Sequence, residues 1–117
     1  MVALVAWGPL IVASLLAPAS PVQSGASDFT LVNGTGGALS ELSIRRSGTG
    51  DWKSLGEAPA AGAKQPISFN NPDCAFDIRA TIPGSGPVTW ADVNLCDVKS
   101  VTLKRDESAG AWVDYDH

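Results

Sequence analysis

Short runs in which apolar and polar residues alternate, separated by glycine- and proline-rich segments, constrain this chain more than any other feature. In the run 76–82, for example, Phe76, Ile78 and Ala80 alternate with polar residues. Such alternation places successive side chains on opposite faces of a half-buried β-strand. After residue 28 no long stretch shows a helical apolar period, so the sequence predicts an all-β fold, an antiparallel β-sandwich of about seven or eight short strands. The other runs of this kind span 29–32, 39–46, 67–69, 88–95, 98–103 and 111–115, the last expected at a sheet edge.

The clearest unit is a β-hairpin, formed by the run just described and the return run 88–95. Its loop is expected to contain five residues and to be centred on Ser85. That register places Phe76 opposite Asn94, so an apolar residue faces a polar one. A β-bulge near residues 91–92 would restore the alternation, because one extra residue re-aims every side chain after it.

Cys74 and Cys96, the two cysteines of the chain, lie at the open end of this hairpin. The same register brings their sulfur atoms opposite each other, where the geometry allows a disulfide. The spacing is not the C-x-x-C of thiol redox proteins. A Cys74–Cys96 disulfide is therefore predicted, provided that the protein enters an oxidising compartment.

The N-terminal segment 1–19 indicates such a compartment. It carries no charge, is almost entirely apolar and ends in Ala17-Pro18-Ala19, which is typical of a secretory signal peptide with a small-x-small cleavage site. Its apolar run is shorter than the roughly 20 residues that a membrane-spanning helix needs. The sequence predicts a secreted or periplasmic protein with no stable membrane anchor after cleavage, and an uncleaved anchor is the alternative.

Cleavage would leave a mature N-terminus near Ser20, or near Ser27 if processing occurs further along. Residues 20–27 are rich in serine, glycine and alanine and are expected to form a flexible leader. The segment 28–117 is then a single β-sandwich domain. Its formal net charge of −4 argues against nucleic acid as a partner, since phosphates require basic surface.

Catalytic chemistry has few candidates in this chain. His117 is the one histidine, which leaves no Ser-His-Asp triad, no Cys-His dyad and no histidine-based metal site. Asp77 and Asp92 are expected near each other across the hairpin and could act as paired carboxylates in a small hydrolase. A sandwich of this size has little room for a deep cleft that excludes water, so we predict that the protein is not an enzyme.

Acidic residues suggest calcium as the one candidate cofactor. Asp73, Asp77, Asp92 and Asp97 are all expected toward the cysteine end of the hairpin. Calcium takes six to eight oxygen ligands, which loops at one end of a sandwich can supply. The simpler interpretation is that these residues form an ordinary soluble surface, with Asp77 paired either to neighbours on the Arg79 side or to Arg45.

A binding surface is the remaining possibility, and its best candidates lie in loops. Trp52 follows a glycine-rich loop that contains Asp51, and Asn33 begins another such loop. Tryptophan is favoured at binding hot spots, and loops on a rigid scaffold commonly carry function. Trp90, in contrast, alternates in phase with Val88 and is assigned to the core.

The order of several motifs resembles a family of small exported bacterial proteins of uncharacterised activity. Those proteins carry an F-x-L-x-N-x-T-G opening, a serine-glycine loop that ends in tryptophan, and a C-x-[YF]-D-I-R … [VL]-C pair. The resemblance implies a secreted or periplasmic β-fold with a disulfide, and it implies no reaction. The matching segments here are Phe29–Gly36, Leu42–Ile44, Ser47–Trp52, Cys74–Arg79 and Val93–Cys96.

These observations favour an exported, non-enzymatic binding or interaction module for an unknown protein or small ligand. Inhibition of an envelope hydrolase is one concrete form of that function. A calcium-binding β-sandwich domain and a small carboxylate-based hydrolase are the alternatives.

Overall fold

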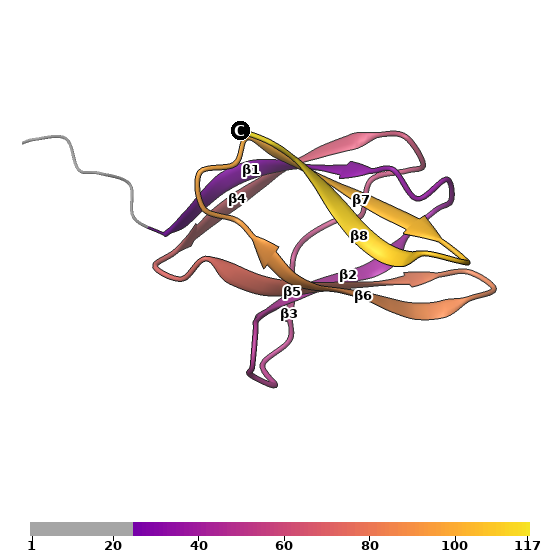
Figure 1. Cartoon of the computed structure of the whole chain (residues 1–117), viewed down its shortest axis with the longest axis horizontal. Coiled ribbons are helices and arrows are strands. Elements are labelled where there is room, and N and C mark those ends of the chain that lie inside the picture. Colours follow the sequence, from indigo (N-terminus) through magenta and orange to yellow (C-terminus); the bar gives the residue numbers. More distant parts are fainter. Residues whose placement is uncertain (1–24) are drawn as a thin grey trace, which may run out of the picture.

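Within residues 25–117, eight strands form two four-stranded sheets that lie one over the other (Figure 1). The computed structural model describes residues 25–117, so the predicted signal peptide at 1–19 lies outside it. The strand order is β4-β1-β7-β8 in the first sheet and β3-β2-β5-β6 in the second. The predicted all-β sandwich is confirmed, with β8 at a sheet edge as expected. The strands are β1 (Ala26–Asn33), β2 (Ser40–Arg46), β3 (Lys53–Ser54), β4 (Lys64–Asn71), β5 (Ala75–Ile82), β6 (Gly86–Asn94), β7 (Ser100–Asp106) and β8 (Gly110–Asp116).

One strand pair departs from the predicted antiparallel arrangement. β1 and β7 run parallel, with Thr30 opposite Ser100 and Asn33 opposite Leu103. The two strands are far apart in the sequence, and β7 joins β1 only after the chain has crossed over from the second sheet. No tight turn connects the pair, and only a tight turn would have forced it to be antiparallel.

Residues 25–117 contain no helical segment that could span a membrane.

The chain joins the first sheet two residues earlier than expected. Ala26 lies within the predicted flexible leader, yet it begins β1, is completely buried and forms a bridge to Cys96. Gly25 before it has a φ of 102°, and a Cβ atom there would lie 2.4 Å from the Asn71 carbonyl oxygen. The first strand therefore begins inside the segment that was predicted as a leader.

Alternate residues of both sheets point inward and form one apolar core. Trp90 and Phe76 are the largest fully buried side chains, so the assignment of Trp90 to the core is confirmed. Its indole Nε1–H donates a hydrogen bond of 2.8 Å to the Lys104 carbonyl, which satisfies this buried polar group and links β6 to β7 in the opposite sheet. Phe69 packs edge-to-face between Phe29 and Phe76, with ring centroids 6.0 Å and 5.2 Å away.

The register of the β5–β6 hairpin differs from the predicted one. Gly86 already pairs with Ile82, so the loop contains three residues rather than five. The φ of Gly86 is 81°, a conformation that favours glycine and lets the return strand start early. As a result Phe76 lies opposite Val93, and the expected pairing with Asn94 is wrong.

The predicted β-bulge is confirmed, and it has a structural consequence. Ile78 pairs with Trp90 and Phe76 pairs with Val93, so two residues of β6 face the single residue Asp77 of β5. Asp92, the second bulge residue, has a φ of 55°. The bulge keeps Trp90 and Val93 both in the core although they are three positions apart.

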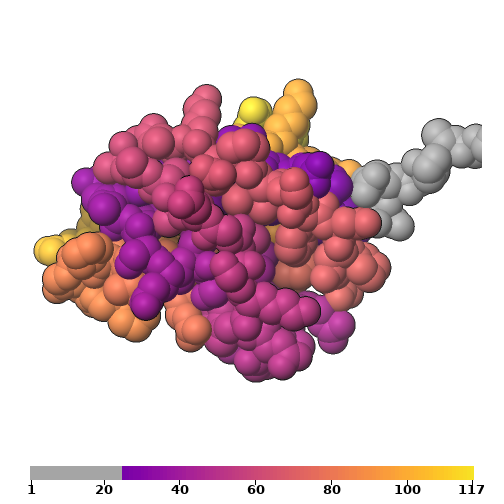
Figure 2. All heavy atoms as spheres, turned by 180° about the vertical axis from the view of Figure 1, so that it is seen from behind, coloured from indigo at the N-terminus to yellow at the C-terminus, as the bar shows by residue number. Residues whose placement is uncertain are grey.

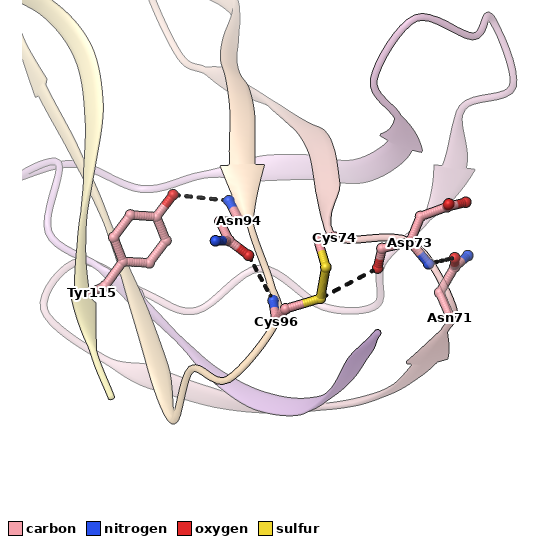
Figure 3. Close-up of a disulfide and its surroundings, with 6 residues drawn as sticks. All are labelled: Asn71, Asp73, Cys74, Asn94, Cys96 and Tyr115. Atoms are coloured by element: carbon pink, nitrogen blue, oxygen red, sulfur yellow. Dashed lines mark hydrogen bonds between the residues drawn. A yellow bond between two sulfur atoms is a disulfide. The ribbon is translucent and has the colours of Figure 1, made fainter. Parts of the chain in front are cut away.

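The Cys74–Cys96 disulfide is confirmed, with a Cα–Cα distance of 5.1 Å (Figure 3). The shorter loop and the bulge shift the register in opposite directions, which is why the cysteines still meet. Asn94 Oδ1 accepts the Cys96 N–H at 2.9 Å, and the Tyr115 hydroxyl accepts the Asn94 N–H at 2.8 Å. The Tyr115 bond ties β8 to the end of β6. A disulfide of this kind is typical of proteins in oxidising compartments outside the cytosol.

Candidate functional site

The loop between β2 and β3 projects away from the second sheet (Figure 1), and from behind it forms a protruding magenta lobe (Figure 2). Turn hydrogen bonds hold it: the Thr49 N–H donates to the Arg46 carbonyl at 3.1 Å, and the Trp52 N–H donates to the Gly50 carbonyl at 3.1 Å. The two-residue strand β3 then pairs with Ser43 and Ile44 of β2. This short pairing brings Trp52 back against the outer face of the sheet.

Trp52 lies against two arginine side chains from neighbouring strands. The guanidinium carbon of Arg45, on β2, is 4.4 Å from the centroid of the Trp52 ring, and that of Arg79, on β5, is 4.0 Å away. A cation–π contact contributes roughly 0.5–1 kcal/mol at an exposed site and about 2 kcal/mol when desolvated. Trp52 is half-buried rather than fully exposed because these contacts cover part of its ring.

Asp77 anchors this arrangement from the sheet below. It is only 5% exposed, and its carboxylate accepts hydrogen bonds from Arg45 Nε at 2.7 Å, Ser47 Oγ at 2.8 Å and the Asp92 N–H at 3.0 Å. The bulge positions the Asp92 N–H for this bond. Of the two pairings considered for Asp77, the structure shows the one with Arg45.

Two opposing effects set the pKa of Asp77. Burial acts to raise it, but the hydrogen bonds from the Asp92 backbone, Arg45 and Ser47, together with the charge of Arg45, lower the pKa below its usual value. Asp77 is therefore a stable anion at neutral pH. We call Trp52, Arg45, Arg79 and Asp77 together the Trp52 site.

A cleft lies beside the Trp52 site, between the edges of the two sheets. Its apolar floor is formed by Ile44, Phe69 and Phe76, and its volume is about 380 Å³. Asp51 and Lys53 lie on its polar rim. Asp51, a predicted binding-loop residue, is thus exposed next to Trp52 at the mouth of a cleft within the usual size range of small-ligand sites.

Asn33 lies apart from this surface. Its side chain is completely buried: Nδ2 donates to the Gly37 and Pro59 carbonyls at 2.8 Å and 3.0 Å, and Oδ1 accepts the Thr35 N–H at 3.1 Å and the Thr35 hydroxyl at 2.7 Å. Through these hydrogen bonds the side-chain amide of Asn33 holds the glycine-rich loop in its conformation. In this structure Asn33 supports the loop from within and presents no side-chain surface to a ligand.

The four aspartates considered for calcium do not converge. Asp73 pairs with Arg46 at 3.1 Å, Asp77 is surrounded by three hydrogen-bond donors, and the side chains of Asp92 and Asp97 are exposed. Within residues 25–117 no three His, Cys, Asp or Glu side chains come close enough to share a metal ion. Calcium binding remains an untested prediction.

The carboxylate pair considered for hydrolysis is a structural contact. Asp77 and Asp92 are neighbours as expected, but the contact is between the Asp77 carboxylate and the Asp92 backbone N–H. A general acid for glycoside hydrolysis needs a raised pKa, whereas the pKa of Asp77 is lowered. The hydrolase alternative gains no support from this geometry.

Sequence reasoning did not identify Arg79 as a site residue. The alternation of β5 shows only that Asp77 and Arg79 share its outer face. Their meeting with Trp52 depends on the pairing of β2 with β5, which joins segments more than thirty residues apart, such as Arg45 with Asp77. A tryptophan that follows a glycine-rich loop and an outward-facing arginine on a distant strand carry no local signal of contact.

Comparison with known proteins bears on the fold only. No protein-family model matches the chain, and no curated protein matches it. An NMR structure of a protein from Eubacterium rectale is similar, with a TM-score of 0.58 over 83% of this chain and 94% of that one. At 15% sequence identity, this likeness shows a shared β-sandwich architecture.

Proposed function

We propose that this protein is an exported, non-enzymatic binding module whose contact surface is the Trp52 site and the projecting β2–β3 loop. The observation that carries the proposal is the stacking of Trp52 on Arg45 and Arg79. Tryptophan and arginine are the residues most enriched at binding hot spots. Here they are grouped on the outer face of a sheet, away from the core that stabilises the fold.

The rigidity of the site supports the same proposal. The buried, ion-paired Asp77 fixes Arg45, and the turn bonds of the loop fix the backbone of Trp52. A surface ordered before association loses less conformational entropy on binding, which increases affinity. The adjoining cleft with its aromatic floor gives a partner an apolar pocket to fill.

We expect Trp52→Ala to abolish the capture of envelope partners, with a loss of affinity of at least tenfold, because it removes the centre of the contact surface. Trp112→Ala is the matched control, since Trp112 is 41% exposed on β8 of the opposite sheet. Affinity capture from envelope extract, followed by titration of each captured protein, compares the two variants with the wild type. Equal losses in both variants, or none in Trp52→Ala, would contradict the proposal.

Export is the second part of the proposal, and it predicts the mature N-terminus. We expect cleavage after Ala19 and a chain that begins at Ser20, because the buried Ala26 and the closely packed Gly25 must remain for β1 to form. Mass spectrometry of the protein recovered outside the cytosol measures this. A product that begins at Ser27 or retains Met1 would contradict it. Ala19→Leu, which spoils the small-x-small site, is expected to retain the signal.

A further inference from the structure

Only one of the two guanidinium groups that contact Trp52 has a carboxylate partner. Arg45 is neutralised by Asp77 at 2.7 Å, whereas no carboxylate of residues 25–117 forms an ion pair with Arg79. Arg79 is nevertheless half-buried and held 4.0 Å from the centre of the Trp52 ring. Two guanidinium groups around one ring repel each other, so the single buried carboxylate leaves one positive charge uncompensated.

Arg79 lines a shallow depression on the outer face of the second sheet. Of the charged residues that line it, Lys53 also has no ion pair within the described chain, and Glu41 accepts a hydrogen bond of 2.9 Å from the Thr81 hydroxyl. Two cations thus face one anion in a chain whose net charge is −4. We call this surface the face depression; its lining includes Trp52, Arg79, Lys53, Glu41, Ser43 and Thr81.

These residues match a ligand that carries a carboxylate, hydroxyl groups and a flat apolar face. The planar guanidinium of Arg79 can bind a carboxylate through two parallel N–H bonds. Ser43, Thr81 and Glu41 can exchange hydrogen bonds with hydroxyl groups. Trp52 lines the depression and is partly exposed, so the C–H face of a sugar ring can pack against the part of its ring that the two guanidinium groups leave uncovered.

An acidic peptide fits the same surface less well. Peptides that bind by adding a strand to a sheet gain their affinity from main-chain pairing with an exposed strand edge. The face depression overlies strands β2 and β5, which are paired with each other, and β2 is also paired with β3. The edge strand β3 lies only at its border, so its centre offers side chains and no strand edge, which suits a polysaccharide lying across the sheet.

We propose that the face depression binds an acidic saccharide, with the sugar carboxylate on Arg79 and the adjacent sugar ring against Trp52. This inference names the ligand class of the proposed binding module and rests on the same Trp52 site. Binding makes and breaks no covalent bond. Lys53 adds a second positive charge at the rim of the depression.

The test uses the full mature protein and three polysaccharides that contain hexuronate: polygalacturonate, alginate and hyaluronate. Each is compared by calorimetry with its own carboxyl-reduced form, which keeps the sugar chain and loses the charge. We expect binding to at least one polymer and at least tenfold weaker binding to its reduced form. Arg79→Gln is expected to weaken binding at least tenfold, and Arg105→Gln, on β7 of the other sheet, to leave it unchanged.

Because Arg79 contacts the Trp52 ring, Arg79→Gln could weaken binding by moving the tryptophan, and a second variant tests the charge separately. Lys53→Gln removes an exposed charge and keeps both guanidinium contacts of the Trp52 ring, so it should weaken binding about threefold with unchanged Trp52 fluorescence. Binding to none of the three polymers, equal binding of the reduced forms, or equal binding of poly-glutamate would each overturn the inference. If Trp52→Ala still abolishes capture of an envelope protein in that case, the proposed function stands and only the ligand class is wrong.

Discussion

Replacing both cysteines, in Cys74→Ser/Cys96→Ser, is expected to lower the free energy of unfolding by about 3 kcal/mol. The disulfide closes a loop with a sequence separation of 22, and its loss returns that chain entropy to the unfolded state. For a domain of this size the change corresponds to a fall in Tm of roughly 15 °C. Thermal and urea unfolding of the oxidised wild type and the double variant measure it.

Reduction provides the matched control for the disulfide. A reductant should destabilise the wild type by about the same amount and should leave the double serine variant unchanged. The effect is expected to reach beyond the β5–β6 hairpin, because Cys96 also bridges Ala26 of β1 in the other sheet. A wild type that is insensitive to reductant under conditions that demonstrably break the bond would contradict this account of the domain's stability.

Asp77→Ala is expected to destabilise the folded protein by about 3 kcal/mol, because it leaves three donors without an acceptor near the core. These donors are Arg45 Nε, Ser47 Oγ and the Asp92 N–H. Since Arg45 is released at the same time, the Trp52 ring should lose one of its two guanidinium contacts. Chemical unfolding measures the stability, and acrylamide quenching measures the increased exposure of Trp52 in a background that lacks Trp112.

Asp73→Ala is the matched control, because Asp73 also pairs with an arginine of β2. The side chains of Asp73 and Arg46 are 43% and 57% exposed, so their pair should contribute less than about 0.5 kcal/mol. A destabilisation equal to that of Asp77→Ala would show that burial of Asp77 is not the source of its effect.

Acidification should reveal the Asp77 contribution independently. Its pKa is lowered in the folded state, so its stabilising effect is complete above the pKa of the unfolded chain, about 3.9. The contribution is lost as the pH falls through the lower folded-state pKa. The stability difference between wild type and Asp77→Ala should therefore be constant from pH 7 to about 5 and should shrink below about pH 4. A difference that grows on acidification would contradict the lowered pKa.

The β5–β6 hairpin shows how far local patterns carry a prediction. The strand pair, the bulge near Asp92 and the disulfide were all predicted correctly, while the loop length and the pairing of Phe76 were wrong. Alternation specifies which residues face the core, but glycine conformation sets the length of the turn. The φ of Gly86 shortens the loop, and that conformation is not encoded in the apolar pattern.

The candidate site was predictable only in part, for a similar reason. Trp52 and Asp51 could be proposed because a glycine-rich loop precedes an aromatic residue. Arg79 could not be proposed, because its contact with Trp52 depends on the pairing of β2 with β5, which the local sequence does not indicate. The burial of Asn33 could not be predicted from the sequence either, since its hydrogen-bond partner, the Pro59 carbonyl, lies in a different loop.

The sequence alone determined the all-β class, the position of most strands, the inward side of the clearly alternating strands and the cysteine pairing. These properties follow from alternation, turn chemistry and short-range register, which act over a few residues. Tertiary structure alone decided the parallel pairing of β1 with β7, the burial of Asp77 and the meeting of Arg45 and Arg79 at Trp52. Those features arise when strands distant in the chain become neighbours, and that choice depends on how the two sheets pack together.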